Sequence, residues 1–377
     1  MCGQVVRNDV IWNVRKHCSV GAIAAWIEKV DPDAEHRWKG FRLVVAYAIA
    51  VGLGSLWDVV TLTSSGVRMA QLAGGFALWA SVSEARSERV AASCDLVILC
   101  AAAMVGAMSY CLLSPLLGQH EWISGESVLI TGAFLVAYLK CFGTLGGGIG
   151  SQVYIGQLLA FGFDVGPGDI GLVGVAGLIA IVASVLPRWL VYRGQRVYAT
   201  EAVASASPPP DRETAFLNGI QTAVAATVVV ALNNVFVLTE SAWAITACVY
   251  VITATPQGTL ERARHRIVGT LIGVPIGLAC MPLAAHAPIL TWIVAGVAII
   301  VYTVALPRRY DVACGAFAFT LIVTLEVSGQ HSTAVLMSRV WETMLGAALG
   351  VAMALLIWWS VAALLPRSGA ARQRTRA

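Results

Sequence analysis

Two arginines and three glycines recur on one face of a predicted helix between residues 262 and 277. At about 100° per residue, Arg262, Arg266, Gly269, Gly273 and Gly277 fall within roughly 80° of one another. Guanidinium groups bind carboxylates through paired hydrogen bonds, and glycines let a second helix approach closely. The face could therefore carry an anion-attracting group at the inner mouth of a transport pathway. The alternative is a tight packing seam, with arginines that only fix the topology.

A second face of this kind lies in SRVWETMLGAALG (338–350). Arg339, Glu342, Thr343, Gly346 and Gly350 share a face about 100° wide, with Arg339 and Glu342 one helical turn apart. An unpaired charge within a bilayer costs about 2.5–3.5 kcal/mol on insertion scales, so such side chains should face protein or water. Glu342 could accept a proton that couples transport, with Arg339 tuning its protonation or meeting an anion. The alternative is a structural ion pair.

The charged turn that precedes the first face has a weaker copy in the first half of the chain. EARSERVAASCDL (84–96) overlays ERARHRIVGTLIG (261–273), so that Arg89 matches Arg266 and Ala92–Ser93 matches Gly269–Thr270. At a slightly different offset Asp169 matches Glu342, which makes Asp169 its counterpart on the transport path. The loop GFDVGPGD around Asp169 also suits a plain solvated residue. These matches predict an internal duplication.

The composition is typical of a polytopic membrane protein. The chain has 377 residues, of which 58% are hydrophobic and 12% charged, and its mean hydropathy is +0.76. Soluble domains are about a quarter charged, and the long continuous apolar runs exclude an alternating β-barrel pattern. The nine cysteines form no CxxC pair, so no disulfide framework or metal site is expected. The net charge of +4 is distributed over the short turns, which gives no reason to expect a nucleic-acid partner.

Hydropathy predicts an all-α integral membrane protein with about twelve transmembrane helices. The candidate segments are 43–62, 68–83, 94–115, 126–143, 149–163, 169–190, 216–238, 242–255, 268–285, 288–306, 312–327 and 338–363. With the amino terminus inside, all of the 25 Lys and Arg residues except Arg68 and Arg339 fall on the inner side. The positive-inside rule therefore assigns both termini to the cytoplasm.

The spans divide the chain into two six-helix membrane repeats, 41–190 and 216–363. Because six is even, the second repeat enters the membrane in the same orientation as the first, as a parallel repeat. Residues 1–40 form a cytoplasmic leader that could hold an interfacial helix or be loosely ordered. A Pro-rich cytoplasmic linker (191–215) and a basic cytoplasmic tail (364–377) complete the chain. Since the fused repeats could supply both partners of a dimer, either a monomer or a homodimer is expected.

Motifs for catalysis or cofactors are not found in the sequence. The glycine run GTLGGGIGS (143–151) lacks the GK[ST] of a phosphate-binding loop and joins two predicted spans. It is expected to be a flexible cytoplasmic turn. The sequence also has no HExxH, no GxSxG and no Cys/His ligand cluster. We therefore expect neither an enzyme nor a bound cofactor or metal.

The second half resembles the fusaric-acid-resistance, or aromatic-acid-exporter, family. That family combines a Trp-x-x-Thr span, a proline-glycine turn, an arginine followed by Gly-Thr-x-x-Gly, and a terminal Arg-x-x-acid-Thr-x-x-Gly. Here these motifs correspond to Trp243, Thr246, Pro256, Gly258, Arg266, Gly269, Thr270, Gly273, Arg339, Glu342, Thr343 and Gly346. The similarity covers residues 213–360 and extends more loosely to the first half. This chain has no sizeable cytoplasmic domain between its halves, unlike many longer members.

The resemblance implies a bacterial inner-membrane exporter of small aromatic or other organic acids, driven by the proton gradient. In several such systems a periplasmic adaptor protein is the partner. A passive organic-anion channel is the first alternative, because arginines can concentrate anions without a coupling carboxylate. A membrane scaffold for envelope assembly, without transport, is the second.

Overall fold

The computed structural model describes residues 35–364, apart from 62–68, 87, 119–123, 191–208, 237, 239–240, 254, 308 and 328–332. Every regular element in this described part is helical, which confirms the all-α prediction for it. The first half contains α2 (Glu35–Thr61), α3 (Met69–Ser83), α4 (Arg89–Leu117), α5 (Val128–Tyr138), α6 (Gly143–Gly162) and α7 (Ile170–Leu190). Short 3₁₀ turns flank them: η1 (Gly125–Ser127), η2 (Leu139–Phe142) and η3 (Pro167–Asp169).

The second half contains α9 (Arg212–Phe236), α10 (Ser241–Val251), α11 (Pro256–Ala279), α12 (Met281–His286), α13 (Pro288–Ala305), α14 (Tyr310–Val327) and α15 (Thr333–Leu364). Helix α9 begins where the linker ends, because Asp211 accepts a hydrogen bond from the Thr214 backbone N–H at 3.2 Å. The hydrogen bonds from Thr214 lower the pKa of the Asp211 carboxyl. The leader's predicted interfacial helix falls on residues outside the described part, except that residues 35–40 belong to α2.

The prediction of a flexible turn at 143–151 is wrong. Residues 143–162 form α6, and the chain reverses just before it, through η2 and at Gly143, whose φ of +82° suits only glycine. Helices α5 and α6 then pack as an antiparallel hairpin, with Gly146 against Leu139 and Gly150 against Leu135 and Val136. The glycines that indicated a loop instead allow two helix backbones to meet, as small residues do in membrane proteins.

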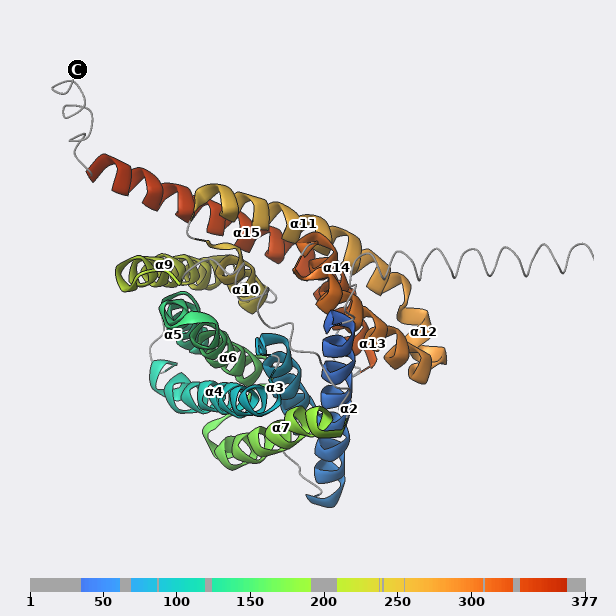
Figure 1. The fold of residues 1–377 in the computed structure, drawn as a ribbon. Coiled ribbons are helices and arrows are strands. Elements are labelled where there is room, and N and C mark those ends of the chain that lie inside the picture. Colours follow the sequence, from blue (N-terminus) through green and yellow to red (C-terminus); the bar gives the residue numbers. More distant parts are fainter. Residues whose placement is uncertain are drawn as a thin grey trace, which may run out of the picture.

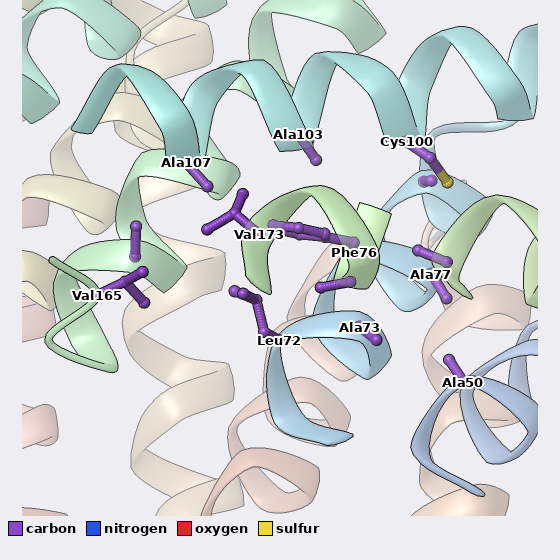
Figure 2. Close-up of a cluster of buried hydrophobic side chains, with 14 of the residues drawn as sticks. Ala50, Leu72, Ala73, Phe76, Ala77, Cys100, Ala103, Ala107, Val165 and Val173 are labelled. Carbon is purple, nitrogen blue, oxygen red and sulfur yellow. The ribbon is translucent and has the colours of Figure 1, made fainter. Parts of the chain in front are cut away.

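Much of the first half packs around one apolar core. Residues of α3, α4 and α7 form a single buried cluster, together with Ala50 of α2, Val128 of α5, Ala160 of α6 and Val165 from the turn before α7. Figure 2 shows Phe76 of α3 at its centre, with Ala103 and Ala107 of α4 and Val173 of α7 around it. Alanines line much of this cluster, so the helices can approach closely, and packing rather than hydrophobicity joins them in lipid.

Several helix contacts of the second half correspond to contacts of the first. Helix α11 packs on α14 and α15, as α4 packs on α6 and α7, and α10 packs on α15, as α3 packs on α7. Its buried residues fall into several small clusters, for example Val274, Ala318 and Ile322 between α11 and α14.

The first helix of each half contacts the other half. Helix α2 lies against α13, and α9 lies against α5 (Figure 1). At the first contact the rings of Tyr47 and Trp292 are 6.3 Å apart, and Thr303 donates a hydrogen bond to the His36 carbonyl at 3.3 Å. At the second, the Phe134 and Phe216 rings are 5.8 Å apart.

A buried polar cluster also joins the halves. Glu126, in η1 before α5, accepts hydrogen bonds from the Asn233 amide at 3.0 Å and from the Ser241 hydroxyl. Asn233 lies near the end of α9, and Ser241 begins α10. Because buried polar groups are costly unless they are hydrogen-bonded, this cluster also fixes where α9 and α10 meet the first half.

Six helical stretches within the described residues are long and apolar enough to cross a membrane: His36–Thr61, Arg89–Leu117, Gly125–Gly162, Pro167–Leu190, Arg212–Phe236 and Met337–Leu356. One of them, Gly125–Gly162, is the α5–α6 hairpin. Three shorter apolar helices accompany them: Ser241–Val251, Ile289–Ala305 and Tyr310–Val323. Each of the twelve apolar segments identified in the sequence overlaps a helix, but the number that cross a bilayer stays a prediction. Large apolar side chains are exposed on these helices, with Val60 at 78% and Val235 at 72%, as lipid contact would require.

Basic residues gather where α2, α3, α4 and α7 end or begin together. The Lys39 ammonium donates to the carbonyls of Val82 and Glu84 at 2.9 and 2.7 Å. Arg188 forms a buried ion pair with Glu84, and Arg86 pairs with Asp95 at 3.1 Å. These contacts hold four helix ends on one face of the molecule.

Candidate functional site

A cavity of about 1330 Å³ lies between the two halves. Its first wall comes from α2, α3 and α6 and carries apolar and aromatic side chains such as Tyr47, Trp79 and Phe161. Its second wall comes from α10, α11, α13, α14 and α15 and carries all of its charged lining residues: Glu261, Arg262, His265, Arg266 and Arg339. Three arginines against one glutamate leave an excess of positive charge on this wall. The cavity can therefore offer an anion a cationic side and an apolar side at once.

Helix α11 positions the first two arginines. Thr255 caps it by accepting a hydrogen bond from the Gly258 N–H at 3.2 Å, and Pro256 follows at the first helical position. This capping explains the proline-glycine turn, since proline suits the first turn, where its missing N–H is not needed. Arg262 and Arg266 then follow one turn apart, and both line the cavity together with Thr270.

The glycines of α11 pack against α14. Gly269 faces the carbonyl of Asp311, Gly273 faces Gly315, and Gly277 lies against Ile322. This close packing of α11 on α14 holds α11 in place at the cavity wall. The two interpretations of this helix face are therefore both compatible with the structure, because the glycines pack while the arginines face the cavity.

Three tyrosines that sequence reasoning missed lie near Arg266. Tyr250 of α10, Tyr302 of α13 and Tyr310 of α14 all line the cavity, and each interacts electrostatically with Arg266. The Nε of Arg266 is buried without a hydrogen-bond partner among the described residues. One signal could have revealed part of this group, because Trp243, Thr246 and Tyr250 recur at helical spacing and therefore share a face.

The other end of the charged wall contains Arg339 and Thr343 of α15. The guanidinium of Arg339 lies over the Trp243 ring, 4.1 Å from its centroid, in cation–π geometry. Glu342 is fully buried at 0% exposure and is not among the residues that line the cavity. Gly346 packs against the Ala244 carbonyl, and Gly350 lies near Cys248, so the α10–α15 seam holds Glu342 just behind the wall.

Asp169 is not brought to this cavity. It lies in η3, where its carboxylate accepts a hydrogen bond from the Gly166 N–H at 3.0 Å. Glu342 does not line the cavity either, so the predicted place of Asp169 on a transport path stays a prediction; in the structure its carboxylate holds the turn that begins α7. Its interpretation as a solvated loop residue agrees better with this position.

Arg89, which the sequence overlay matches to Arg266, does not line the cavity either. Arg89 lies 3.9 Å from the centroid of the Trp189 ring and donates to the Trp189 carbonyl at 3.0 Å. It ties the start of α4 to the end of α7. Among the residues that the structure describes, no group of three or more His, Cys, Asp or Glu side chains could hold a metal ion.

The apolar helices and the internal cavity define a multi-pass α-helical membrane protein. Residues 224–353 match the family described as fusaric acid resistance protein-like. The match runs from α9 into α15 and includes Arg262, Arg266, Arg339 and Glu342, so the predicted family resemblance is confirmed for this part of the chain. No curated protein and no solved structure matches the chain significantly.

Proposed function

We propose that this protein is a secondary transporter that exports small aromatic or other organic acids across the bacterial inner membrane. The observation that carries the proposal is the composition of the cavity. Arg262, Arg266 and Arg339 supply cationic groups for a carboxylate, while aromatic side chains of both walls suit an apolar ring. The similarity of residues 224–353 to the fusaric acid resistance protein-like family supports a transport role. Catalysis is not part of the proposal.

The proposal includes a duplicated architecture of twelve crossing helices. Its support is a correspondence of helix contacts, because the first helix of each half packs on the other half: α2 on α13, and α9 on α5. A rotation axis between two like-oriented repeats would produce this correspondence. A second equivalence lies at the end of the first helix in each half. Asp58 accepts from the backbone N–H groups of Met69 and Ala70, and Asn233 accepts from the N–H of Leu238. Both side chains hold the chain that leads into the second helix.

The proposed orientation places both termini in the cytoplasm. The basic helix ends that meet at Lys39, Arg86 and Arg188 form one face, and the positive-inside rule assigns such a face to the cytoplasm. Arg262 and Arg266 then lie at the inner end of the cavity and Arg339 at its outer end. A periplasmic adaptor protein would meet the outer end, and one chain would form a complete path.

Glu342 is the proposed proton-coupling residue. Its carboxyl group is fully buried in the α10–α15 seam, next to residues of the cavity wall. Its neighbours Arg339 and Thr343 line the cavity, so a small movement of α15 against α10 would expose the carboxyl group to substrate or water. This arrangement would link release of an anion to binding of a proton.

The test is uptake and efflux of a panel of weak organic acids in proteoliposomes, with and without an imposed pH gradient. The wild-type protein should accumulate an aromatic acid against its gradient when the pH gradient is present. Glu342→Gln should abolish this accumulation while downhill exchange persists, and Glu213→Gln, an exposed carboxylate on α9, should behave as the wild type. Uphill accumulation by Glu342→Gln would remove Glu342 from the mechanism. Currents that reverse at the anion equilibrium potential, independent of pH, would instead indicate a channel.

A further inference from the structure

One face of α2 and one face of α13 line the cavity along much of the length of each helix. The lining residues of α13 recur every three or four positions from Trp292 to Tyr302, and those of α2 recur in the same way from Leu43 to Gly52. Residues at this spacing share one face of a helix. No charged residue is among the described lining residues of these two helices. We call the two lining faces, within residues 43–52 and 292–302, the apolar strip.

Helices α2 and α13 lie side by side (Figure 1). Gly40 of α2 faces Thr303 of α13, and further along the rings of Tyr47 and Trp292 are 6.3 Å apart. The helices therefore run in opposite directions, and their lining faces follow each other. From Tyr302 to Trp292 the apolar strip is about 15 Å long, at about 1.5 Å per residue. A single aromatic ring would cover only part of this length.

Arg266 lies at one end of the apolar strip. Tyr302, the lining residue of α13 farthest from Trp292, interacts electrostatically with Arg266. The main interaction partners of Arg266 are hydroxyl and thiol groups, such as those of Tyr310 and Cys314. Among the described residues no carboxylate forms an ion pair with Arg266, and its Nε is buried without a hydrogen-bond partner. This end of the strip can therefore bind a carboxylate through charge-assisted hydrogen bonds.

We propose that the cavity binds medium-chain alkanoates, with the carboxylate at Arg266 and the alkyl chain along the apolar strip. The inference rests on the proposed function and extends its substrate class from single-ring acids to amphipathic monocarboxylates. A methylene group lengthens an extended alkyl chain by about 1.3 Å, since carbon–carbon bonds of about 1.5 Å alternate in direction. A strip of about 15 Å therefore holds a chain of about twelve carbon atoms.

Competition binding to the full-length protein in lipid nanodiscs tests this inference, with radiolabelled decanoate as the displaced ligand and empty nanodiscs as the background. The competitors are benzoate, 1-decanol and the even-numbered alkanoates from butanoate to hexadecanoate. Each added methylene group should tighten binding about two- to fourfold, as the burial of a CH₂ group does. The gain should end at about twelve carbon atoms, where the strip ends. Decanol should bind about tenfold or more weakly than decanoate, because a hydrogen bond to a charged group contributes this much.

Variants at the two ends of the strip separate the contribution of the charge from that of the chain. Arg266→Gln should weaken every alkanoate by the same factor of about ten and leave the gain per methylene group unchanged. Arg264→Gln, an exposed neighbour that does not line the cavity, should change neither. Arg266→Lys, which keeps the charge, should retain most of the affinity and serves if Arg266→Gln does not fold.

Trp292→Ala should weaken dodecanoate about fivefold and leave hexanoate within about twofold, because only the longer chain reaches this ring. Ile293→Ala, an exposed neighbour on α13 that does not line the cavity, should change neither. Trp292→Leu, which keeps an apolar side chain, should show a smaller loss of the same pattern and serves if Trp292→Ala does not fold. An equal loss for short and long acids would overturn the inference, because the chain would not lie along the strip.

Failure of this inference is distinguishable from failure of the proposed function. An affinity that does not rise with chain length, or decanoate that binds no more tightly than benzoate, would overturn the alkanoate inference. Direct binding of radiolabelled benzoate then decides the other question. If benzoate binds, the proposed export of aromatic acids stands, and if neither benzoate nor any alkanoate binds, the proposed function fails as well.

Discussion

Replacing Gly273 by alanine should separate α11 from α14 and weaken the wall that carries Arg266. A Cβ atom built at Gly273 would lie 2.9 Å from the Cα of Gly315 and still closer to its carbonyl oxygen. Non-bonded carbon atoms prefer separations of about 3.5–4.0 Å, so the helices would have to separate by roughly 0.6 Å or more. Both obstructing groups belong to the backbone, which cannot rotate away. We expect a loss of about 1–3 kcal/mol in the free energy of unfolding, as overpacked sites show.

The assay is SDS-induced unfolding of the purified protein in mixed micelles, followed by circular dichroism. Gly171→Ala on α7 is the matched control, since nothing lies within 4 Å of a Cβ atom built there. It should leave the stability unchanged or raise it by up to about 1 kcal/mol through helix propensity. If Gly273→Ala is as stable as Gly171→Ala, the α11–α14 seam is not as close as the structure shows, and the placement of Arg266 loses its support.

Three further predictions concern the helix ends. Arg188→Met or Glu84→Gln alone should lower the free energy of unfolding in SDS by about 3–5 kcal/mol, because either change leaves the other charge buried without its partner. The double variant should lose less than the sum of the two single losses. Additive losses would contradict the pairing. Arg309 donates to both carboxylate oxygens of Asp311 and lowers the pKa of Asp311 to about 2. Since the folded pKa lies below the unfolded value of about 3.9, the pair stabilises fully above that value and loses its contribution as the pH falls toward 2. The melting-temperature difference between wild type and Asp311→Asn should shrink over that range, and a constant difference would argue against the pair. Arg264→Cys should react with an impermeant maleimide in inverted vesicles and not in intact cells; the reverse would invert the proposed topology.

The helices could be predicted from the sequence, but one of the turns could not. Long apolar runs indicate helices whatever their neighbours are, because an apolar segment in lipid must satisfy its own backbone. The run GTLGGGIGS was misjudged because glycine favours turns in water and close helix contacts in lipid. Which of the two applies depends on α5, which is the partner of α6 and is not visible in the local sequence.

The charged part of the site was accessible from sequence, and its surroundings were not. Arg266 and Arg339 stood out because charge is rare in this chain, and both line the cavity. Tyr302 and Tyr310 carry no such signal, since they come from separate helices and meet Arg266 only in the folded protein. The apolar wall formed by α2, α3 and α6 gave no signal either, because a cavity wall and a lipid-facing surface have the same composition.

The halves differ in what surrounds the two arginines that the sequence overlay matches. Arg89 stacks on Trp189 and donates to its carbonyl, so its charge holds helix ends together. Arg266 has tyrosines as neighbours instead, and under the proposed function these would orient an anion without cancelling the positive charge. The low-dielectric walls then strengthen the positive electrostatic potential that this charge produces inside the cavity. The second half should therefore determine the selectivity for anions. The first half should determine the selectivity for the shape of the apolar part of the substrate. Exchanging Trp79 for leucine should accordingly change which aromatic acids bind, while the requirement for a carboxylate persists.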